Sequence, residues 1–386
     1  MSFDSLSLIL VVSAAQGFFL AVIILFRQRK IYASRFLAAL IFFYSFFILG
    51  AFISQAGFIE KYPRLLFLTP GLPLLFGPLH YLYASYLIHP QREKFPAIQW
   101  LHFLPFILFR LSLIRDMIRP AHEILGYIHG IATEKPLIPA WIPDWFLVLQ
   151  GLTYMALTIR ILQIYRHQIE DAFSTIEKIN LSWLQRITYL ATVVWVLIFI
   201  KDLVYLFEYR IFGDLHVEAI LTAIYVYALG YLGLFKAEVF AWPEISQAIQ
   251  KLEESQDSAR EKYEKSGLTE ETAQKHLRDL EKLMIAQKPF QKPDLTLHEL
   301  SRMLSIKPHN LSEILNRYLQ QNIYDYINMY RVKQVKRDMN DPMKENLTLL
   351  ALALDAGFNS KSSFNSIFKK FTGVTPSAYR QSPVTD

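Results

Sequence analysis

Residues 348–380 decide how this sequence is interpreted, and they read TLLALALDAGFNSKSSFNSIFKKFTGVTPSAYR. Apolar residues recur at helical spacing at the start of the stretch, at Leu349, Leu352, Ala353 and Ala356. Gly357 can then turn the chain with a positive φ at no steric cost. Asn359 or Ser360 can cap a second helix after this turn. The stretch therefore predicts two short helices joined by a tight turn.

The second of these helices has two contrasting faces. Its apolar residues fall at i, i+3, i+4 and i+7, namely Phe364, Ile367, Phe368 and Phe371. Lys, Ser and Asn side chains on the other side suit a major groove, where they reach phosphates and base edges. The candidate DNA-contacting residues are Ser360, Lys361, Ser362, Ser363, Asn365, Ser366, Lys369 and Lys370. On spacing alone, an ordinary amphipathic helix with a solvated basic face fits equally well.

The same pattern occurs 53 residues earlier, in residues 296–318, which read TLHELSRMLSIKPHNLSEILNRY. At this offset Leu311, Ile314, Leu315 and Tyr318 align with the four apolar positions of the later helix, and Leu297 and Leu300 align with Leu350 and Ala353. Pro308 suits the first turn of a helix. The outward positions add the candidate DNA-contacting residues His309, Asn310, Ser312, Glu313, Asn316 and Arg317. Two helix-turn-helix units in one small domain are a far more specific indication of DNA binding than one amphipathic helix.

Residues 322–340, between the two units, predict a helix that links them. Such a helix is about 28 Å long at 1.5 Å per residue. Successive major grooves on one face of B-DNA lie ~34 Å apart, so this helix could set two recognition helices into adjacent groove segments. Its basic residues, Arg331, Lys333, Lys336 and Arg337, are candidate phosphate contacts, although a solvated face explains them equally well.

With these motifs, residues 276–382 resemble the DNA-binding domain of the AraC/XylS family of bacterial transcription regulators. The resemblance depends on Leu311-Ser312, YINMYRV in the linking helix, AGFNSKSSFNSIFKKFTGVTP in the second unit and Tyr379-Arg380. It implies an all-helical bipartite domain that binds promoter DNA as a dimer on repeated sites. Two positions depart from the family pattern, since Gln321 replaces a common glycine and Ser301 a common alanine. The chain resembles the membrane-embedded members of the family, which have several N-terminal spans.

The first 240 residues predict a transmembrane domain of about seven helices. A bilayer-spanning helix needs about 20 mainly apolar residues. The predicted spans are Leu6–Phe26, Ala33–Ser54, Leu65–Ile88, Trp100–Ile114, Trp145–Tyr165, Ile187–Phe207 and Ala219–Phe235. Because no basic segment precedes the first span, we interpret it as an uncleaved membrane helix rather than a signal peptide.

Basic residues in the loops predict how these spans are oriented. The loop after the first span, RQRKIYASR, is strongly basic, and Lys and Arg favour the cytoplasmic side. If the protein lies in a bacterial inner membrane, an odd number of spans then leaves the N-terminus outside the cell membrane and the C-terminal block in the cytoplasm. The predicted domains are 1–240, the membrane sensor; 241–275, a helical linker; and 276–386, the DNA-binding domain.

Three ionisable residues in or near apolar spans are candidates for signal sensing: Arg110, Lys201 and Asp202. Charged groups in a bilayer are costly unless they are paired or hydrated, so a functional role is the default hypothesis. The alternatives are that Arg110 reaches an interface and that Lys201 and Asp202 mark a helix end. Pro70, Gly71 and Pro73 should break the third span.

The linker and the overall composition further limit the functions that the chain can have. In the linker, Ile245, Ile249 and Leu252 begin an apolar stripe that soon fades, so the segment either transmits a signal or is a solvated spacer. Residues 281–386 hold 15 Lys and Arg against 10 Asp and Glu, a weakly basic balance that permits nucleic-acid binding. With no cysteine in the chain, thiol catalysis and thiolate metal sites are excluded.

Together these features predict an all-helical, membrane-anchored one-component regulator. We expect no enzymatic activity, no cofactor and no metal. The expected partners are double-stranded promoter DNA, the lipid bilayer, an unknown signal ligand, RNA polymerase and a second copy of the chain on DNA. Two alternatives stay open: a membrane receptor or transporter whose cytosolic domain acts through protein contacts, and a membrane-bound enzyme with a regulatory tail.

Overall fold

The computed structural model describes residues 4–90, 92, 94–128, 144–205, 217–236 and 268–381. These residues form helices and contain no strand, which confirms the all-helical fold class. The chain divides into two compact units, one of residues 1–163 and 181–246 and the other of residues 164–180 and 247–386. The second unit therefore combines the C-terminal region with a short segment from between two N-terminal helices.

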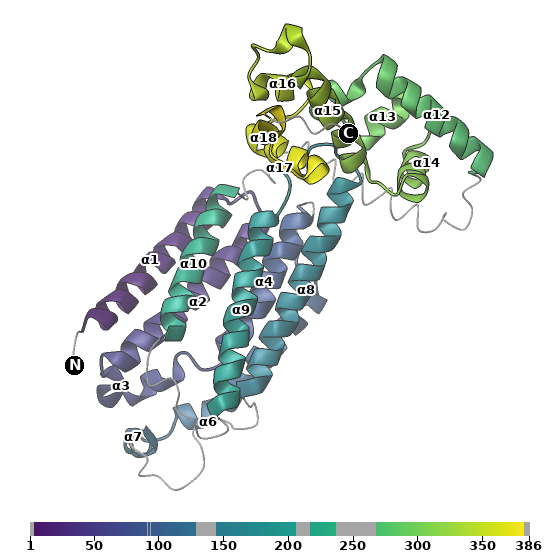
Figure 1. The fold of residues 1–386 in the computed structure, drawn as a ribbon. Helices are drawn as coiled ribbons and strands as arrows, with labels where there is room; N and C mark the ends of the chain where they lie inside the picture. The colour runs from purple at the N-terminus through teal and green to yellow at the C-terminus, as the bar shows by residue number, and fades with distance from the viewer. Residues whose placement is uncertain are drawn as a thin grey trace. The chain divides into compact units, whose positions relative to one another are not determined.

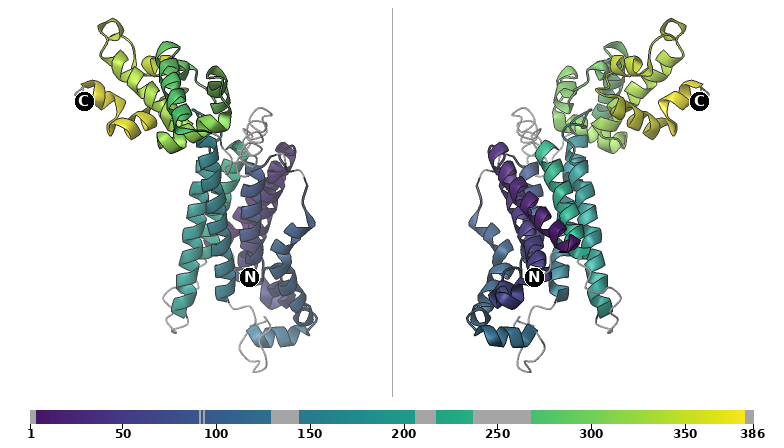
Figure 2. Two further views of the ribbon diagram at one scale, coloured as in Figure 1. Left: turned by 90° about the vertical axis from the view of Figure 1, so that its right-hand side faces the viewer. Right: turned by 90° about the vertical axis from the view of Figure 1, so that its left-hand side faces the viewer.

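The first unit is a bundle of long apolar helices (Figures 1 and 2). Its main helices are α1 (Ser5–Arg27), α2 (Ala33–Gln55), α4 (Pro73–Ile88), α8 (Asp144–Glu170), α9 (Ser182–Tyr205) and α10 (Val217–Lys236). The helix α2 packs against α1, α4 and α10. Small residues let neighbouring helices approach closely: a Cβ on Gly17 of α1 would lie 2.1 Å from Oγ of Ser45 in α2.

Shorter helices complete this unit: α3 (Phe58–Lys61), α5 (Leu104–Ser112), α6 (Ile114–Met117) and α7 (Ala121–Ile128). Pro70 and Gly71 interrupt the third predicted span, as expected, because Gly71 has a φ of 84° and α4 begins only at Pro73. Leu65–Ile88 is therefore not one continuous helix. The fourth predicted span is also broken, into a 3₁₀ segment, Ala97–Phe103, followed by α5 and α6.

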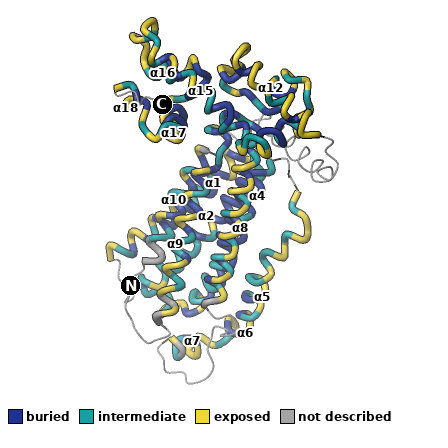
Figure 3. Tube along the Cα trace, turned by 45° about the vertical axis from the view of Figure 1, so that its right-hand side comes forward, coloured by how far each residue is buried: buried dark blue, intermediate teal, exposed yellow. Residues whose placement is uncertain are grey.

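Five helical segments among the described residues are long and apolar enough to cross a membrane: Ser5–Arg27, Ala33–Gln55, Ala97–Met117, Phe146–Glu170 and Ser182–Ile200. Large apolar side chains lie on the outside of the bundle, such as Phe19 and Phe26, which are 67% and 77% exposed. Figure 3 shows exposed residues along the outer helices. An apolar outer surface of this kind suits a lipid environment. The predicted number of seven spans is not confirmed.

The second unit contains α12 (Glu270–Ala286), α13 (Leu297–Met303), α14 (Pro308–Glu313), α15 (Ile323–Met339), α16 (Leu349–Asp355), α17 (Lys361–Thr372) and α18 (Pro376–Gln381). Thr269 caps α12, and Leu280 and Met284 of that helix are buried. The linking helix α15 lies between two apolar clusters, one around Leu311 and Leu315 and the other around Phe364 and Phe368. The apolar stripe of Ile245, Ile249 and Leu252 lies outside the described residues.

Candidate nucleic-acid interface

Hydroxyl caps fix where three of the four helices of the two helix-turn-helix units begin, while α14 begins at Pro308 without one. Thr296 starts α13 in a capping box with Glu299, and Thr348 starts α16 by accepting a hydrogen bond of 3.1 Å from the backbone N–H of Ala351. Ser360 starts α17 in the same way, accepting from the N–H of Ser363 at 3.1 Å. Each cap satisfies N–H groups that a helix terminus leaves without intrahelical partners. The sequence signals for both units are therefore local and strong.

No single offset in residue number aligns both helices of the first unit with those of the second unit. The second helices α14 and α17 begin 53 residues apart, at Pro308 and Lys361, whereas the first helices α13 and α16 begin 52 residues apart, at Leu297 and Leu349. The prediction that Leu297 aligns with Leu350 is therefore wrong, and Leu350 is 38% exposed. The extra residue lies in the turn between α16 and α17.

Equivalent left-handed residues form the two turns. Gly357 has a φ of 97° and Ser305, the corresponding residue of the first unit, has a φ of 56°. A Cβ added to Gly357 would lie 2.3 Å from the carbonyl oxygen of Phe290, so this turn requires glycine both for its backbone angle and for space. Before the linking helix, the left-handed residue is Gln320 with a φ of 52°, next to the position where the family pattern has glycine.

Aromatic packing behind α17 directs its polar face outward. Phe358, Phe364, Phe368 and Tyr379 form a chain of ring contacts with centroids 5.3–5.5 Å apart. These side chains are at most 4% exposed. The opposite face of α17 exposes Lys361, Ser362, Asn365, Ser366, Lys369 and Lys370. All six are predicted DNA-contacting residues, and the structure places them together on one side of one helix.

The first unit presents a smaller polar surface. After Glu313, α14 continues as a π-helical turn, Ile314–Tyr318. His309, Asn316 and Arg317 are exposed, while Asn310 and Ser312 are half-buried. Glu313 is only 8% exposed and forms an ion pair of 3.3 Å with Arg317. A DNA contact by Glu313 stays a prediction that would require this pair to open.

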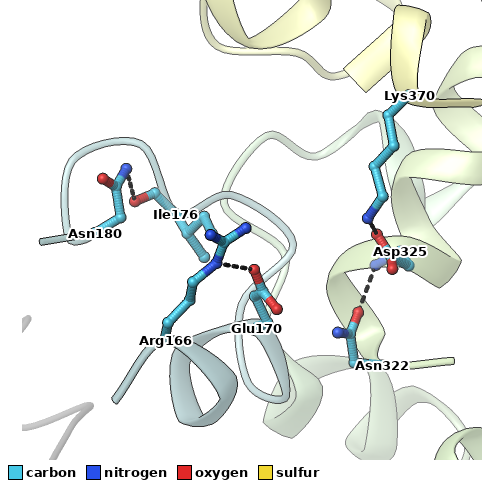
Figure 4. Close-up of polar contacts among 7 residues, drawn as sticks. All are labelled: Arg166, Glu170, Ile176, Asn180, Asn322, Asp325 and Lys370. Carbon is cyan, nitrogen blue, oxygen red and sulfur yellow. Dashed lines mark hydrogen bonds and ion pairs between the residues drawn. The ribbon is translucent and has the colours of Figure 1, made fainter. Parts of the chain in front are cut away.

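Ion pairs hold some of the basic side chains at the surface. Nζ of Lys370 lies 2.5 Å from Oδ1 of Asp325 at the start of α15, as Figure 4 shows. Exposed pairs of this kind contribute only about 0–1 kcal/mol, so phosphates can replace the carboxylate as the partner of the amine. The ion pair therefore leaves Lys370 available for DNA at little cost.

Arg331 does not lie on this surface, and its assignment as a candidate phosphate contact is wrong. Its side chain is 1% exposed, and its guanidinium donates hydrogen bonds to the carbonyl oxygens of Phe290, Lys292 and Pro293 at 2.8–2.9 Å. Burial lowers the pKa of Arg331 to about 10, so the group still carries its charge at neutral pH. It is a structural residue that ties α15 to the segment before α13.

Two predicted DNA contacts of α17's first turn are also engaged within the protein. Ser360 is half-buried and caps the helix, and Ser363 is 7% exposed and donates a hydrogen bond to Oε1 of Glu177. Glu177, Ser174 and Thr175 all approach the domain from the segment between α8 and α9. Sequence reasoning missed these residues, because nothing in their spacing relates them to a domain more than 100 residues away.

Of the three predicted sensing residues, only Arg110 has a described side chain. Nη1 of Arg110 donates to the carbonyl oxygen of Phe67 at 2.7 Å, next to the break at Pro70 and Gly71. This bond gives Arg110 a structural role, since it satisfies a carbonyl at a helix break, and its sensing role stays a prediction. The side chains of Lys201 and Asp202 lie outside the described residues. Within the described ranges, no three metal-ligating side chains come together.

The bundle contains a buried polar cluster that the sequence did not indicate. His80 of α4 lies 2.9 Å from the hydroxyl of Thr188 in α9 and 2.7 Å from the hydroxyl of Tyr225 in α10. The three side chains link three helices through hydrogen bonds in an apolar interior. Single polar residues inside apolar spans could have suggested it.

Comparison with known proteins gives matches in the C-terminal region. Residues 300–382 match a helix-turn-helix domain model. The melibiose operon regulatory protein of Escherichia coli (strain K12) is 31% identical over 87 residues, which cover 22% of this chain and 28% of that protein. An uncharacterized HTH-type transcriptional regulator of Staphylococcus aureus (strain COL) is 33% identical over 87 residues, covering 22% of this chain and 11% of that protein.

The C-terminal region is an AraC-type helix-turn-helix domain. This confirms the part of the resemblance that concerns DNA-binding architecture. The chain spans less than a third of the length of these relatives, so the likeness does not extend to their remaining domains. No solved structure matches the chain.

Proposed function

We propose that this chain is a membrane-anchored one-component transcription regulator that binds promoter DNA sequence-specifically under the control of a signal sensed by its membrane domain. The observation that carries the proposal is the pairing of two helix-turn-helix units, whose second helices expose Lys, Arg, Asn, Ser and His side chains. Such side chains position a protein on phosphates and read base edges in a major groove.

The linking helix supports a bipartite mode of binding. α15 has 17 residues, which gives a length of about 26 Å at 1.5 Å per residue. The width of the flanking units adds to this length, and adjacent major grooves on one face of B-DNA are ~34 Å apart. We therefore propose that α14 and α17 enter two successive groove segments and that a second copy binds a repeated site. RNA polymerase is a further proposed partner of the protein.

The membrane half of the proposal is supported by the apolar helices and by one connection. The segment 164–180 belongs to the same compact unit as the helix-turn-helix domain, so both must lie on one side of a membrane. Arg166 and Lys178, which lie in this segment, favour the cytoplasmic side. This agrees with a cytoplasmic C-terminal domain and an N-terminus outside.

DNA binding is tested with the full chain in lipid nanodiscs and a random-sequence duplex library. We expect enrichment of a defined sequence that the chain binds at least about tenfold more tightly than a scrambled duplex. The same selection is carried out with Asn365→Ala. This variant removes an exposed amide from α17 and should relax the sequence preference. Recovery of unselected sequences after several rounds would rule out specific recognition.

Membrane topology is tested separately with reporter fusions in cells. A reporter fused after Phe235 should be active only in the cytoplasm, because the proposed orientation assigns the basic first loop and the helix-turn-helix domain to that side. A periplasmic signal at this position would refute the proposed orientation.

A further inference from the structure

Residues 171–177, which follow α8 and form a segment that we name the strap, pair with the helix-turn-helix domain. The backbone N–H of Ser174 donates to the carbonyl of Leu295 at 3.1 Å, and the N–H of Leu297 donates to the carbonyl of Ala172 at 2.9 Å. Phe173 thereby faces Thr296 in an antiparallel bridge. The segment that precedes α13 is thus hydrogen-bonded to a part of the chain that leads directly from α8.

The buried guanidinium of Arg331 holds the strap in place. Its Nη1 donates to the carbonyl oxygen of Ser174 at 3.2 Å and to Oγ1 of Thr175 at 3.1 Å, and its Nη2 donates to Oγ of Ser174 at 3.2 Å. Asn328 adds a bond of 3.1 Å to the same carbonyl. A buried charge is stable only when its donors are satisfied, so the strap completes a site that the domain alone leaves partly unsatisfied.

The two ends of the strap reach both recognition elements. The carboxylate of Asp171 lies close enough to Asn316, in the turn that extends α14, for the two side chains to interact electrostatically. The carboxylate of Glu177 accepts from Ser363 in the first turn of α17, and its second oxygen is buried without a partner among the described residues. Asn316 and Ser363 are two of the residues predicted to contact DNA. The strap therefore occupies a polar group at the N-terminal end of α17 and lies beside the turn that extends α14.

The charge of the strap opposes DNA at these positions. A helix N-terminus attracts anions through its dipole and its unpaired N–H groups, and phosphates bind there for the same reason. Recognition helices contact base edges through their N-terminal residues. The carboxylate of Glu177 lies at this end of α17, where it takes the place of an anion and repels nearby phosphates. Burial raises the pKa of Asp171 at the other end of the strap.

We propose that the strap is an autoinhibitory segment: docked, it blocks the N-terminal end of α17 and lies beside the turn that extends α14, and a signal that moves α8 withdraws it. This inference rests on the proposed function. The helix α8 runs from Asp144 to Glu170 and leads directly into the strap. Arg166 and Glu170 at its end form an ion pair of 2.9 Å, and Figure 4 shows them beside the start of α15. A displacement of α8 is therefore carried to the strap without any intervening flexible chain.

A disulfide that fixes the docked strap tests this directly, because the chain contains no cysteine. Phe173→Cys with Thr296→Cys is the suitable pair, since residues that face each other in such a non-hydrogen-bonded pair have Cα atoms about 4.5 Å apart, close enough for a disulfide. In nanodiscs, the oxidised full-chain variant should bind the selected duplex at least about tenfold more weakly than the same sample after reduction. The single variants control for the lost cap of Thr296 and for oxidation.

A second pair of variants tests the charge. Glu177→Gln keeps the hydrogen-bond acceptor but removes the charge from the end of α17, and it should tighten DNA binding by about threefold to tenfold. The matched control is Glu170→Gln, whose carboxylate pairs with Arg166 and should have no such effect. Failure of the cysteine pair to cross-link, equal binding in both redox states, or weaker binding by Glu177→Gln would overturn the autoinhibitory strap. Absence of DNA binding in every variant would overturn the proposed function itself, even where cross-linking shows that the strap docks.

Discussion

The two helix-turn-helix units follow one plan but differ in how their second helices are built. In the second unit, α17 is a regular 12-residue helix that begins at the cap Ser360 and ends at Gly373 with a φ of 78°. In the first unit, α14 has six residues and continues as a π-helical turn. A π turn widens the helix and breaks its regular ladder of hydrogen bonds.

This difference indicates that the two units contribute differently to DNA affinity. α17 exposes Lys361, Lys369 and Lys370 on a continuous face, whereas the first unit exposes Arg317 beside a buried Glu313. Phosphate contacts contribute most of the affinity and base contacts the specificity. We therefore expect the second unit to contribute more to overall affinity. The first unit should depend more on its fit against the linking helix.

The largest expected effect is on the core behind the two recognition helices. Phe368→Ala should destabilise the domain by about 3–5 kcal/mol, because it truncates a fully buried aromatic side chain. Its counterpart Leu315→Ala should cost about 2–5 kcal/mol, since leucine has fewer buried atoms to lose. Amide hydrogen exchange of α15 in the full chain would measure both. Unchanged protection in Phe368→Ala would contradict the assignment of this core.

Exchange of the left-handed residue should destabilise the turn of the second unit and leave the turn of the first unit almost unchanged. Gly357→Ala should cost at least about 1–3 kcal/mol from backbone strain, with a further cost because its Cβ would meet the carbonyl oxygen of Phe290. Ser305→Gly should change stability by less than about 1 kcal/mol, because relief of strain offsets the greater entropy of the unfolded chain. Urea unfolding followed by pulse proteolysis would compare the two. A loss for Ser305→Gly as large as that for Gly357→Ala would contradict the left-handed strain assigned to Ser305.

Local signals explain why so much of the domain is evident from the sequence. Thr348 and Ser360 cap their helices, Gly357 supplies the turn, and Phe364 and Phe368 mark the buried face, all within one short stretch. The caps, the turn and the buried face each depend on residues that are close together in the sequence. The predicted alignment of Leu297 with Leu350 is wrong because the turn of the second unit is one residue longer than that of the first. This difference does not change the apolar pattern of either helix, so the sequence pattern does not reveal it.

Contacts between distant segments could not be predicted in the same way. The basic neighbours of Arg331 predict a phosphate contact, but its partners are carbonyls near residue 290 and the strap at residues 174 and 175. Likewise the bond from Arg110 to Phe67 depends on how a broken helix packs. A periodic pattern reports which face of a helix is buried, and does not identify the segment that covers it.

Smaller effects are expected at the DNA-facing surface. Lys369→Ala should weaken binding several-fold and lower the slope of log affinity against log salt by about 0.9, because one phosphate contact is lost. Asn316→Ala, at the corresponding position of the first unit, removes no charge and should leave the slope unchanged. Binding measured at several salt concentrations separates the two. A slope that is the same in Lys369→Ala as in the parent chain would exclude a phosphate contact.

The smallest effect should come from the ion pair between α17 and the linking helix. Lys370→Ala breaks the contact with Asp325, and since the pair is exposed it should cost no more than about 1 kcal/mol of stability. The same measurement of domain unfolding applies. A loss comparable to that of Phe368→Ala would mean that the two units are held together by charge rather than by their apolar clusters.

The central claim is that both units read DNA from one face of the duplex. Hydroxyl-radical footprinting of the full chain in nanodiscs on its selected duplex tests it most directly. The account predicts, for each copy of the domain, two protected patches on one face whose centres lie about 10 base pairs apart, one helical turn. A single protected patch per domain, or protection on opposite faces, would contradict it.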